Sequence, residues 1–274
     1  MSGDAPRRLV LLGHPVGHSL SARFQNAALD AAGIAIRYEA LDVVPDDLPR
    51  VLEELRAQRA AGNVTVPHKE AVAAGCARLS ATARRTGAVN TFRTATDGTL
   101  DGHNTDVAGF QAMADSLGVV REGARVVCLG AGGAAAAVCA AVEAWPRVSV
   151  RLLARTSARA LSLAARFGFH VSATVLPAEA LADATVIVNA TPAGLADDDH
   201  PVALSVIPRD ACVMDLVYRP GETAWVRAAR TRGHRAADGR EMLLHQGAAA
   251  FEIWFGIQPD LRVMRAALEH ALGT

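Results

Sequence analysis

Short β-rich runs alternate with alanine-rich helical stretches along almost the whole chain, and this alternation constrains the fold most. It is typical of parallel sheets whose strands are joined by crossover helices, so the sequence predicts an α/β fold. The expected strands are residues 7–12, 35–41, 63–66, 125–129, 148–154, 185–189 and 212–217. The expected helices are residues 19–32, 48–61, 241–255 and 259–272, with Gly33 and Gly62 ending the first two. Residues 88–95 and 99–103 flank Asp97-Gly98 and should form a hairpin.

The composition is that of a folded protein, since 51% of the 274 residues are hydrophobic and 20% are charged. This length is enough for two modest domains, each with its own core. Lys plus Arg and Asp plus Glu both number 28, so no net positive field would hold a nucleic acid. We expect no membrane partner, because no apolar run is long enough to span a bilayer and the first residues lack a signal peptide. The four cysteines form no C-x-x-C pair, so we expect reduced thiols, no metal site and a cytoplasmic protein.

Residues 126–135 have the pattern of a strand, a tight glycine turn and a helix start, and fit the G-x-G-x-x-G/A motif of dinucleotide-binding folds. Gly130 permits the tight turn, and Gly132 lets the backbone approach a pyrophosphate. The following helix N-terminus offers free N–H groups and the positive end of its dipole. An ordinary glycine-rich connection is the alternative, but the strand and helix around it favour dinucleotide binding. The candidate cofactor-binding residues here are Gly130, Ala131, Gly132, Gly133 and Ala134.

The strand after this loop indicates which dinucleotide is bound. NAD-binding folds carry an acid near the end of that strand, which holds the ribose 2′-hydroxyl. Here residues 154–159 contain two arginines and no acid. The guanidinium groups of Arg155 and Arg159 suit a 2′-phosphate, and Thr156 adds a hydroxyl donor. A solvated pair of surface arginines is the alternative, but at this location we favour NADP over NAD as the cofactor.

Two polar clusters are candidates for proton transfer. Reduction of a carbonyl needs a proton donor, and a lysine at a strand end can serve if its surroundings tune it. Lys69 follows a predicted strand that stops at Pro67, and Asp106 lies just before a predicted helix. The alternatives are a surface lysine and a first-turn acid that favours the helix dipole. The nearby histidines lack metal-ligand spacing and are interpreted as structural: His14, His18, His68 and His103.

Several segments together resemble one known family over nearly the whole chain. They are residues 13–21 (GHPVGHSLS), 63–69 (NVTVPHK), 87–91 (GAVNT), 104–109 (NTDVAG), 130–135 (GAGGAA), 189–192 (NATP), 215–220 (DLVYRP) and 238–246 (DGREMLLHQ). In this order they resemble the shikimate dehydrogenase family, and the set is far more specific than any single segment.

The resemblance implies a two-domain α/β fold with a cleft between the domains. A mixed-sheet substrate-binding domain would comprise residues 1–106 plus about 247–274, and a Rossmann-like NADP-binding domain would comprise residues 107–246. The implied reaction is the reversible, NADPH-dependent reduction of 3-dehydroshikimate to shikimate. This reaction belongs to the shikimate pathway, which leads to chorismate and the aromatic amino acids.

The resemblance also implies roles for single residues. Lys69 and Asp106 would form the catalytic pair, with Lys69 relaying the proton. The residues implied for substrate binding are Ser19, Ser21 and Tyr218 on the carboxylate side, with Thr65, Asn90, Asp106 and Gln246 on the ring hydroxyls. The cofactor side would include Asn189, Thr191 and Met242. A small hydroxylated acid needs many short hydroxyl and amide partners, and a site built on such hydrogen bonds rejects analogues that lack them.

The sequence departs from the family pattern at three positions, where Ala22 replaces a proline, Gln25 a histidine and Ala154 an asparagine. The first two lie near the carboxylate end, which leaves quinate, amino-shikimate or aminoquinate open as the substrate, whereas Thr65 favours shikimate. A non-catalytic sensor of NADP or a metabolite is an alternative of another class, and the lysine–aspartate pair argues against it. Apart from a small-molecule substrate we expect no partner, and a monomer or a homodimer would fit.

Overall fold

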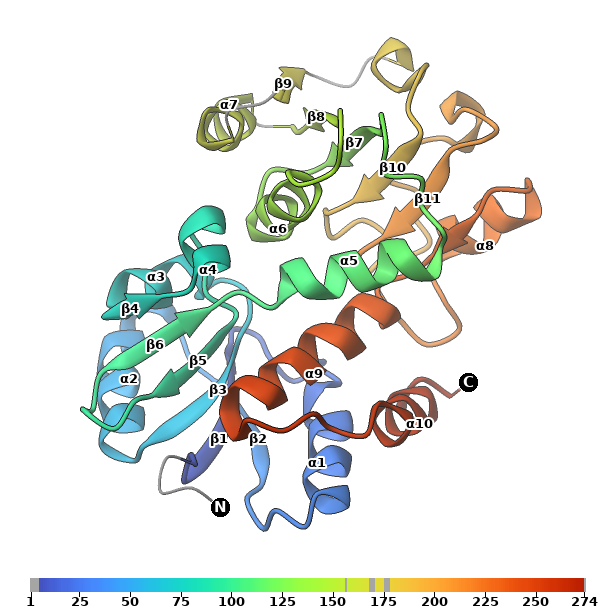
Figure 1. Ribbon diagram of the computed structural model, residues 1–274. Helices are drawn as coiled ribbons and strands as arrows, with labels where there is room; N and C mark the ends of the chain where they lie inside the picture. The colour runs from blue at the N-terminus through green and yellow to red at the C-terminus, as the bar shows by residue number, and fades with distance from the viewer. Residues whose placement is uncertain (1–4, 156, 168–170, 175–177, 274) are drawn as a thin grey trace. The chain divides into compact units, whose positions relative to one another are not determined.

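The computed structural model describes residues 5–155, 157–167, 171–174 and 178–273. The chain forms two compact units: Met1–Gly109 with Leu243–Thr274, and Phe110–Met242. It enters the second unit within helix α5 (Asp106–Ser116) and returns to the first within helix α9 (Arg240–Phe255), as Figure 1 shows. The α/β class expected from the sequence is confirmed. In the described part of the chain, no helix is both long and apolar enough to cross a bilayer.

The first unit is built on a mixed six-stranded sheet with the order β2-β1-β3-β5-β6-β4. Its strands are β1 (Arg8–Gly13), β2 (Tyr38–Asp42), β3 (Ala60–Val64), β4 (Arg78–Leu79), β5 (Thr91–Thr94) and β6 (Leu100–His103). β1 is parallel to β2 and β3, whereas β5 is antiparallel to β3 and β6. The predicted hairpin is therefore present, with Gly98 at a φ of 79° in its turn. The carboxyl ends of β3 and β6 lie at the same edge of the sheet as the start of β5.

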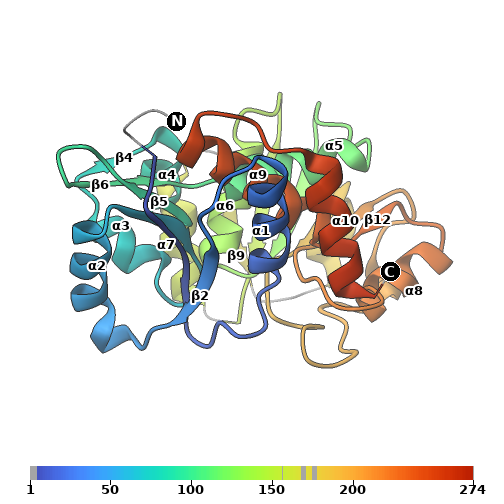
Figure 2. The ribbon, with the colours of Figure 1, turned by 90° about the horizontal axis from the view of Figure 1, so that it is seen from below.

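Helices cover both faces of this first sheet. They are α1 (Ser21–Ala31), α2 (Leu48–Ala57), α3 (Lys69–Gly75), α4 (Ala81–Thr86) and α10 (Leu261–Leu272), with the C-terminal part of α9; a 3-10 turn, Pro45–Asp47, precedes α2. α2 lies on one side of the sheet and α1 on the other, and α1 packs beside α10 (Figures 1 and 2). Under α2 and α3, the core includes Leu12 of β1, Leu52 and Leu55 of α2 and Val72 of α3.

The expected helix over residues 48–61 is wrong at its end, because α2 stops at Ala57 and β3 begins at Ala60. Alanine favours helices, but Arg59 adopts a positive φ of 52° and turns the chain into the sheet. Gly62 lies within β3 instead of ending a helix. A Cβ at Gly62 would lie 2.0 Å from the carbonyl oxygen of Val10 on the neighbouring strand. Close packing in a fully buried strand therefore overrides local helix propensity at residues 60–62.

The second unit is built on a parallel six-stranded sheet with the order β12-β11-β10-β7-β8-β9. Its strands are β7 (Arg125–Leu129), β8 (Ser149–Leu153), β9 (Val171–Thr174), β10 (Val186–Asn189), β11 (Cys212–Asp215) and β12 (Ala236–Ala237). β7 pairs with β8 on one side and with β10 on the other, so the winding direction reverses between β7 and β10. In open α/β sheets, ligands bind beyond the carboxyl ends of the strands at such a switch point.

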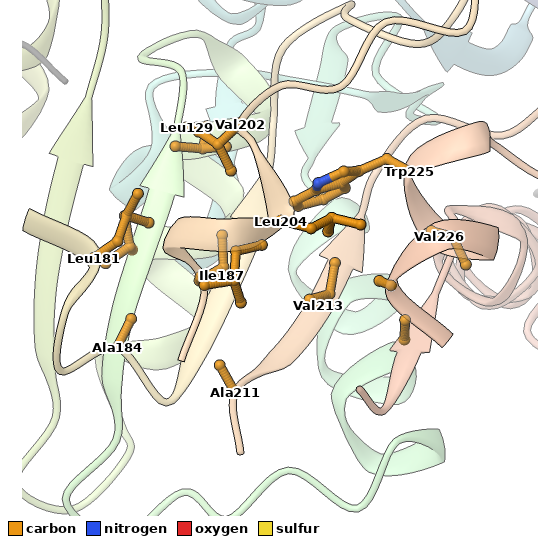
Figure 3. Packing of buried hydrophobic residues seen from close by; sticks show 14 of the residues in the cluster. Leu129, Leu181, Ala184, Ile187, Val202, Leu204, Ala211, Val213, Trp225 and Val226 are labelled. Atoms are coloured by element: carbon orange, nitrogen blue, oxygen red, sulfur yellow. The ribbon is translucent and has the colours of Figure 1, made fainter. Parts of the chain in front are cut away.

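The helices of the second unit enclose an apolar core around this sheet. They are α6 (Gly133–Val142), α7 (Ser157–Arg166) and α8 (Ala224–Thr231), with 3-10 turns at Ala178–Leu181 and Leu204–Val206. Figure 3 shows part of the core, where Ile187 of β10, Val213 of β11 and the fully buried Trp225 of α8 belong to one cluster. Cys128 of β7 is fully buried as well.

Candidate functional site

A lysine and an aspartate meet at the polar edge of the first sheet. Lys69 is the first residue of α3, which follows β3, and Asp106 is the first residue of α5, which follows β6. Because β3 and β6 end at the same edge, the two side chains come together, and Lys69 Nζ donates to Asp106 Oδ2 at 2.6 Å. Their side chains are 20% and 10% exposed. The pair is therefore largely shielded from water yet reachable by a ligand.

Lys69 is also the single lysine in the chain, since 27 of the 28 lysine and arginine residues are arginine. A guanidinium group keeps its proton in proteins, whereas a lysine ammonium can release one when its surroundings favour it. The one long basic side chain that can exchange a proton therefore stands beside Asp106.

Asn90 connects the aspartate to a wider buried network. Its Nδ2 donates to Asp106 Oδ1 at 2.8 Å and to Thr105 Oγ1 at 3.0 Å, and lies 3.4 Å from Gln246 Oε1. Its Oδ1 accepts from the Thr105 backbone N–H at 2.7 Å. Each carboxylate oxygen of Asp106 thus has its own donor, the lysine on Oδ2 and Asn90 on Oδ1. This arrangement fixes the orientation of the carboxylate toward Lys69.

Two further buried asparagines support this network, and the sequence did not indicate their roles. Asn104 accepts from the Asp106 backbone N–H at 3.1 Å and donates to the Ala88 carbonyl at 3.0 Å. Asn63 donates to the Asn90 carbonyl at 3.1 Å. They hold the backbones of Asp106 and Asn90. The sequence signal that could have indicated these roles is an asparagine at the end of an apolar strand. A buried amide needs hydrogen-bond partners, so such a residue is expected to hold neighbouring backbone in place.

The serines predicted to bind a carboxylate lie together at the start of α1. Ser19 Oγ donates to Ser21 Oγ at 3.2 Å and accepts from the Ser21 backbone N–H at 3.3 Å. Gln25, one turn further on, is buried and donates to the Gly247 carbonyl at 2.9 Å, which ties α1 to α9. Thr65 is half-buried, and its side chain makes no hydrogen bond with any residue that the structure describes. Its hydroxyl is therefore available to a ligand.

Two of the nearby histidines have hydrogen-bond partners within the chain. His14 Nδ1 lies 2.5 Å from Asp42 Oδ1, and the buried His68 has Nε2 2.6 Å from the Val43 carbonyl oxygen. Among the residues with described positions, no group of three or more His, Cys, Asp or Glu is arranged to hold a metal ion.

In the second unit, the glycine turn links β7 to α6. Gly130 has a φ of 115°, which strains any other residue, and a Cβ there would lie 2.8 Å from the Ala190 carbonyl oxygen. Gly132 is the N-cap of α6, and no described side chain caps the first turn. The backbone N–H groups of this turn are therefore left for an anion, which the helix dipole also favours. Ala135 is fully buried, so only a small side chain fits there.

Arg155 and Arg159 lie beyond the carboxyl end of β8, the strand next to β7, and both are exposed. Neither makes a hydrogen bond or an ion pair within the part of the chain that the structure describes. Both guanidinium groups are therefore available to a ligand phosphate. Thr156, predicted to assist them, lies outside the described residues.

The residues predicted for the nicotinamide half of the cofactor differ in whether their side chains already have hydrogen-bond partners in the chain. Asn189 ends β10, and its Oδ1 accepts from the Thr191 backbone N–H at 3.0 Å and from Thr191 Oγ1 at 2.6 Å. Its Nδ2 donates to Asp215 Oδ1 at 2.8 Å and to the Ala193 carbonyl at 3.1 Å. Asn189 therefore shapes the loop after β10 and has no hydrogen bond left for a ligand. Met242 is buried near the start of α9, and Tyr218, predicted for the carboxylate side of the substrate, is half-buried after β11.

A parallel sheet with an uncapped helix start at its switch point binds dinucleotides, and a shielded lysine–aspartate pair suits proton transfer. These features define an NADP-dependent oxidoreductase for a small polar substrate.

Comparison with known proteins identifies the family. The shikimate dehydrogenase substrate binding domain matches residues 11–92, and the shikimate 5′-dehydrogenase C-terminal domain matches residues 239–269. A shikimate dehydrogenase (NADP(+)) of Rubrobacter xylanophilus is 44% identical over 266 residues, 94% of each chain. The chain belongs to the shikimate dehydrogenase family.

Solved structures agree with this assignment. The shikimate 5-dehydrogenase of Thermus thermophilus, in complex with NADP(H) and shikimate, is 40% identical, with a TM-score of 0.87 over 96% of this chain and 99% of that one. The quinate dehydrogenase of Corynebacterium glutamicum, in complex with NAD, is 31% identical, with a TM-score of 0.88 over 97% of this chain and 99% of that one.

Proposed function

We propose that this protein reduces 3-dehydroshikimate to shikimate with NADPH and catalyses the reverse oxidation with NADP. It is an oxidoreductase that acts on a CH–OH group, and the reaction would place it in the pathway to chorismate and the aromatic amino acids. The observation that carries the proposal is the Lys69–Asp106 pair at 2.6 Å, with the second oxygen of Asp106 held by Asn90. The high identity to shikimate dehydrogenases over nearly the full chain supports it.

We assign the substrate to the polar edge of the first sheet. A hydroxylated ring acid offers several hydroxyls, which short hydroxyl and amide side chains recognise. Thr65 follows β3, Asn90 precedes β5 and Gln246 lies on α9, and each offers such a group. Asn90 contacts both Asp106 and Gln246. Ser19 and Ser21 are proposed for the carboxylate. Tyr218 remains a prediction for the carboxylate side.

The chemistry assigned to this chain is proton transfer. NADPH, when bound, would supply the hydride that reduces the carbonyl carbon. Lys69 Nζ donates a proton to the carbonyl oxygen, so that the new C–H and O–H bonds complete shikimate. In the oxidative direction the same nitrogen takes the hydroxyl proton. Asp106 keeps Nζ in one position during both directions through the 2.6 Å hydrogen bond.

The residues of the second unit fit NADP. We propose that the backbone N–H groups of residues 131–134 hold the pyrophosphate, because the first turn of α6 is uncapped among the described residues. Arg155 and Arg159 would hold the 2′-phosphate, with Thr156 as a further donor. Thr191 and Met242 are proposed for the nicotinamide side, with Asn189 acting through the loop that it shapes.

A substrate panel tests the function. Purified protein is mixed with shikimate, quinate or an amino analogue, each with NADP or NAD, and absorbance is followed at 340 nm. We expect the highest kcat/KM with shikimate and NADP. Measurable NADPH binding without turnover of any substrate would contradict the proposal and favour a non-catalytic sensor.

Quinate is the second candidate substrate. The similarity to a quinate dehydrogenase favours it, and Ala22 and Gln25 near the proposed carboxylate end leave it open. The available hydroxyl of Thr65 favours shikimate instead. Turnover of quinate alone in the panel would keep the mechanism and change the substrate.

We also propose a cytoplasmic enzyme that is a monomer or a homodimer. Cys76, Cys128 and Cys212 are free thiols in the described part of the chain, which suits a reducing compartment. Light scattering coupled to size-exclusion chromatography distinguishes the two oligomeric states.

A further inference from the structure

Asp215 is a fully buried carboxylate at the carboxyl end of β11. Its strand neighbours Val213 and Met214 are apolar and buried. If this position only had to fill space in the core, an apolar side chain would serve it better than a carboxylate. Burial, with a smaller contribution from the neighbouring acid Asp238, raises the pKa of Asp215 to about 6. A carboxylate in such surroundings is unfavourable unless hydrogen bonds compensate. Its presence is therefore explained by the groups that it binds.

Asp215 accepts three hydrogen bonds from three different segments. Oδ1 accepts from Asn189 Nδ2 at 2.8 Å and from the Val217 backbone N–H at 3.1 Å. Oδ2 accepts from Thr223 Oγ1 at 2.8 Å. Asn189 ends β10, and Val217 lies in the loop after β11. Thr223 is the N-cap of α8, where its side chain accepts from the Val226 backbone N–H. One side chain thus joins the loops that follow two neighbouring strands.

The carboxylate also fixes the orientation of the Asn189 amide. A carboxylate only accepts hydrogen bonds, so Asn189 must turn Nδ2 toward it. Asn189 Oδ1 then faces Thr191, from which it accepts two hydrogen bonds. The intervening Ala190 donates its backbone N–H to the Leu129 carbonyl and lies against Gly130 of the phosphate turn. The shape of the loop after β10 therefore depends on Asp215.

This loop lies on the nicotinamide side of the switch point. A dinucleotide spans the crevice at the carboxyl edge of such a sheet, with its adenosine ribose at the strand after the glycine turn, here β8. The other half of the dinucleotide then lies on the opposite side of β7, toward β10 and β11. We propose that Asp215 is a positioning residue that holds the loops after β10 and β11 in the shape that receives the nicotinamide half of NADP(H). This rests on the proposed use of NADP(H); Asp215 acts through Asn189 and Thr223.

Two ligands separate this role from a general effect on folding. NADPH occupies both halves of the cofactor site, whereas adenosine 2′,5′-bisphosphate occupies only the adenosine half. In Asp215→Ala we expect the Kd for NADPH to rise at least about tenfold, because three buried donors lose their acceptor. The Kd for adenosine 2′,5′-bisphosphate should change less than about threefold, and kcat should fall more than the KM for shikimate changes.

Two more variants control the experiment. Asp215→Asn keeps an oxygen for Asn189 and offers an N–H to Thr223 Oγ1, so NADPH affinity should return to within about threefold of the wild type. Thr185→Val removes a side-chain acceptor of the Arg125 backbone N–H, 2.9 Å away, at the amino edge of the same sheet. It should leave both dissociation constants unchanged. If Asp215→Ala does not fold, Thr223→Val should show the same selective loss of affinity for NADPH, with a smaller rise in Kd.

Three results would overturn the proposal. Equal weakening of both ligands would show that Asp215 only maintains the fold of the unit. Wild-type affinity for NADPH in a folded Asp215→Ala would show that the loops keep their shape without it. Failure of Asp215→Asn to restore binding would contradict the hydrogen-bond argument. Absence of NADPH binding by the wild-type protein would instead refute the proposed function.

Discussion

Replacing Lys69 by arginine separates the charge of this side chain from its ability to give up a proton. Arginine keeps a positive group beside Asp106, but its guanidinium does not release a proton at any pH at which the protein is folded. If Lys69 is the proton donor, Lys69→Arg should lower kcat at least about 100-fold, the lower range for a positioned acid–base group. This corresponds to about 2.7 kcal/mol of transition-state stabilisation.

The KM for shikimate should change much less than kcat. The groups proposed for the ring hydroxyls, Thr65 and Asn90, are untouched, and Asp106 keeps a cationic partner on Oδ2 and Asn90 on Oδ1. Lys69→Ala removes the charge as well and leaves Asp106 Oδ2 without its donor. Its kcat should therefore fall at least as far, and its substrate binding should weaken in addition.

Initial rates at 340 nm with saturating shikimate and NADP measure the effect. The matched control is Arg50→Lys, which exchanges the same two side chains at an exposed site where Arg50 pairs with Glu54. It should have the wild-type rate. A near-normal kcat in Lys69→Arg would remove Lys69 from proton transfer and refute the assigned mechanism.

Three other predictions follow from single contacts. Arg155→Ala should raise the Kd for NADPH about ten- to a hundredfold and hardly change the Kd for NADH, since a charged hydrogen bond contributes about 1.5–3 kcal/mol. If a fluorescence titration shows equal loss of affinity for both cofactors, Arg155 does not bind the 2′-phosphate. Gly130→Ala places a Cβ on a residue with a φ of 115° and 2.8 Å from the Ala190 carbonyl oxygen, so it should lower the free energy of unfolding by about 1–3 kcal/mol and weaken NADPH binding. An unchanged melting temperature would argue against that strain. Burial raises the pKa of Asp215 from 3.8 to about 6, so the folded protein binds this proton more tightly than the unfolded chain does. The free energy of unfolding should therefore rise, relative to Asp215→Asn, by about 2 kcal/mol as the pH falls from about 7 to about 4. Urea unfolding of both proteins measures this difference, and a difference that does not change with pH would contradict the reasoning.

Much of the fold was predictable because its signals are local. The Asp97-Gly98 turn determines its hairpin, and the strand, glycine turn and helix around Gly130 are contiguous in the sequence. The failures occur where distant contacts decide the structure. Gly62 and the alanines before it belong to β3 because they pack against β1, which is about 50 residues away in the sequence. Two-residue strands such as Ala236–Ala237 carry no periodic signal, since only their pairing with β11 defines them.

The candidate site was predictable as a set of residues and less so as a network. Lys69 and Asp106 belong to recognisable segments, and the structure brings them within hydrogen-bond distance, while their catalytic role stays a prediction. Links between separate segments, such as Asn104 to Ala88, depend on how strand ends meet and leave no local pattern. Asn189 illustrates the difference, because its segment indicates a cofactor site, whereas its hydrogen bonds are all used within the chain.

Transfer of deuterium from the cofactor to the substrate tests directly whether this protein catalyses the proposed hydride transfer. The protein would be incubated with 3-dehydroshikimate and NADPH deuterated at both hydrogens of nicotinamide C4, and the product analysed by mass spectrometry. We expect shikimate that carries one deuterium on the carbon that bore the ketone, and much slower formation of this product by Lys69→Arg. Unlabelled shikimate, or no shikimate despite bound NADPH, would contradict the proposed hydride transfer.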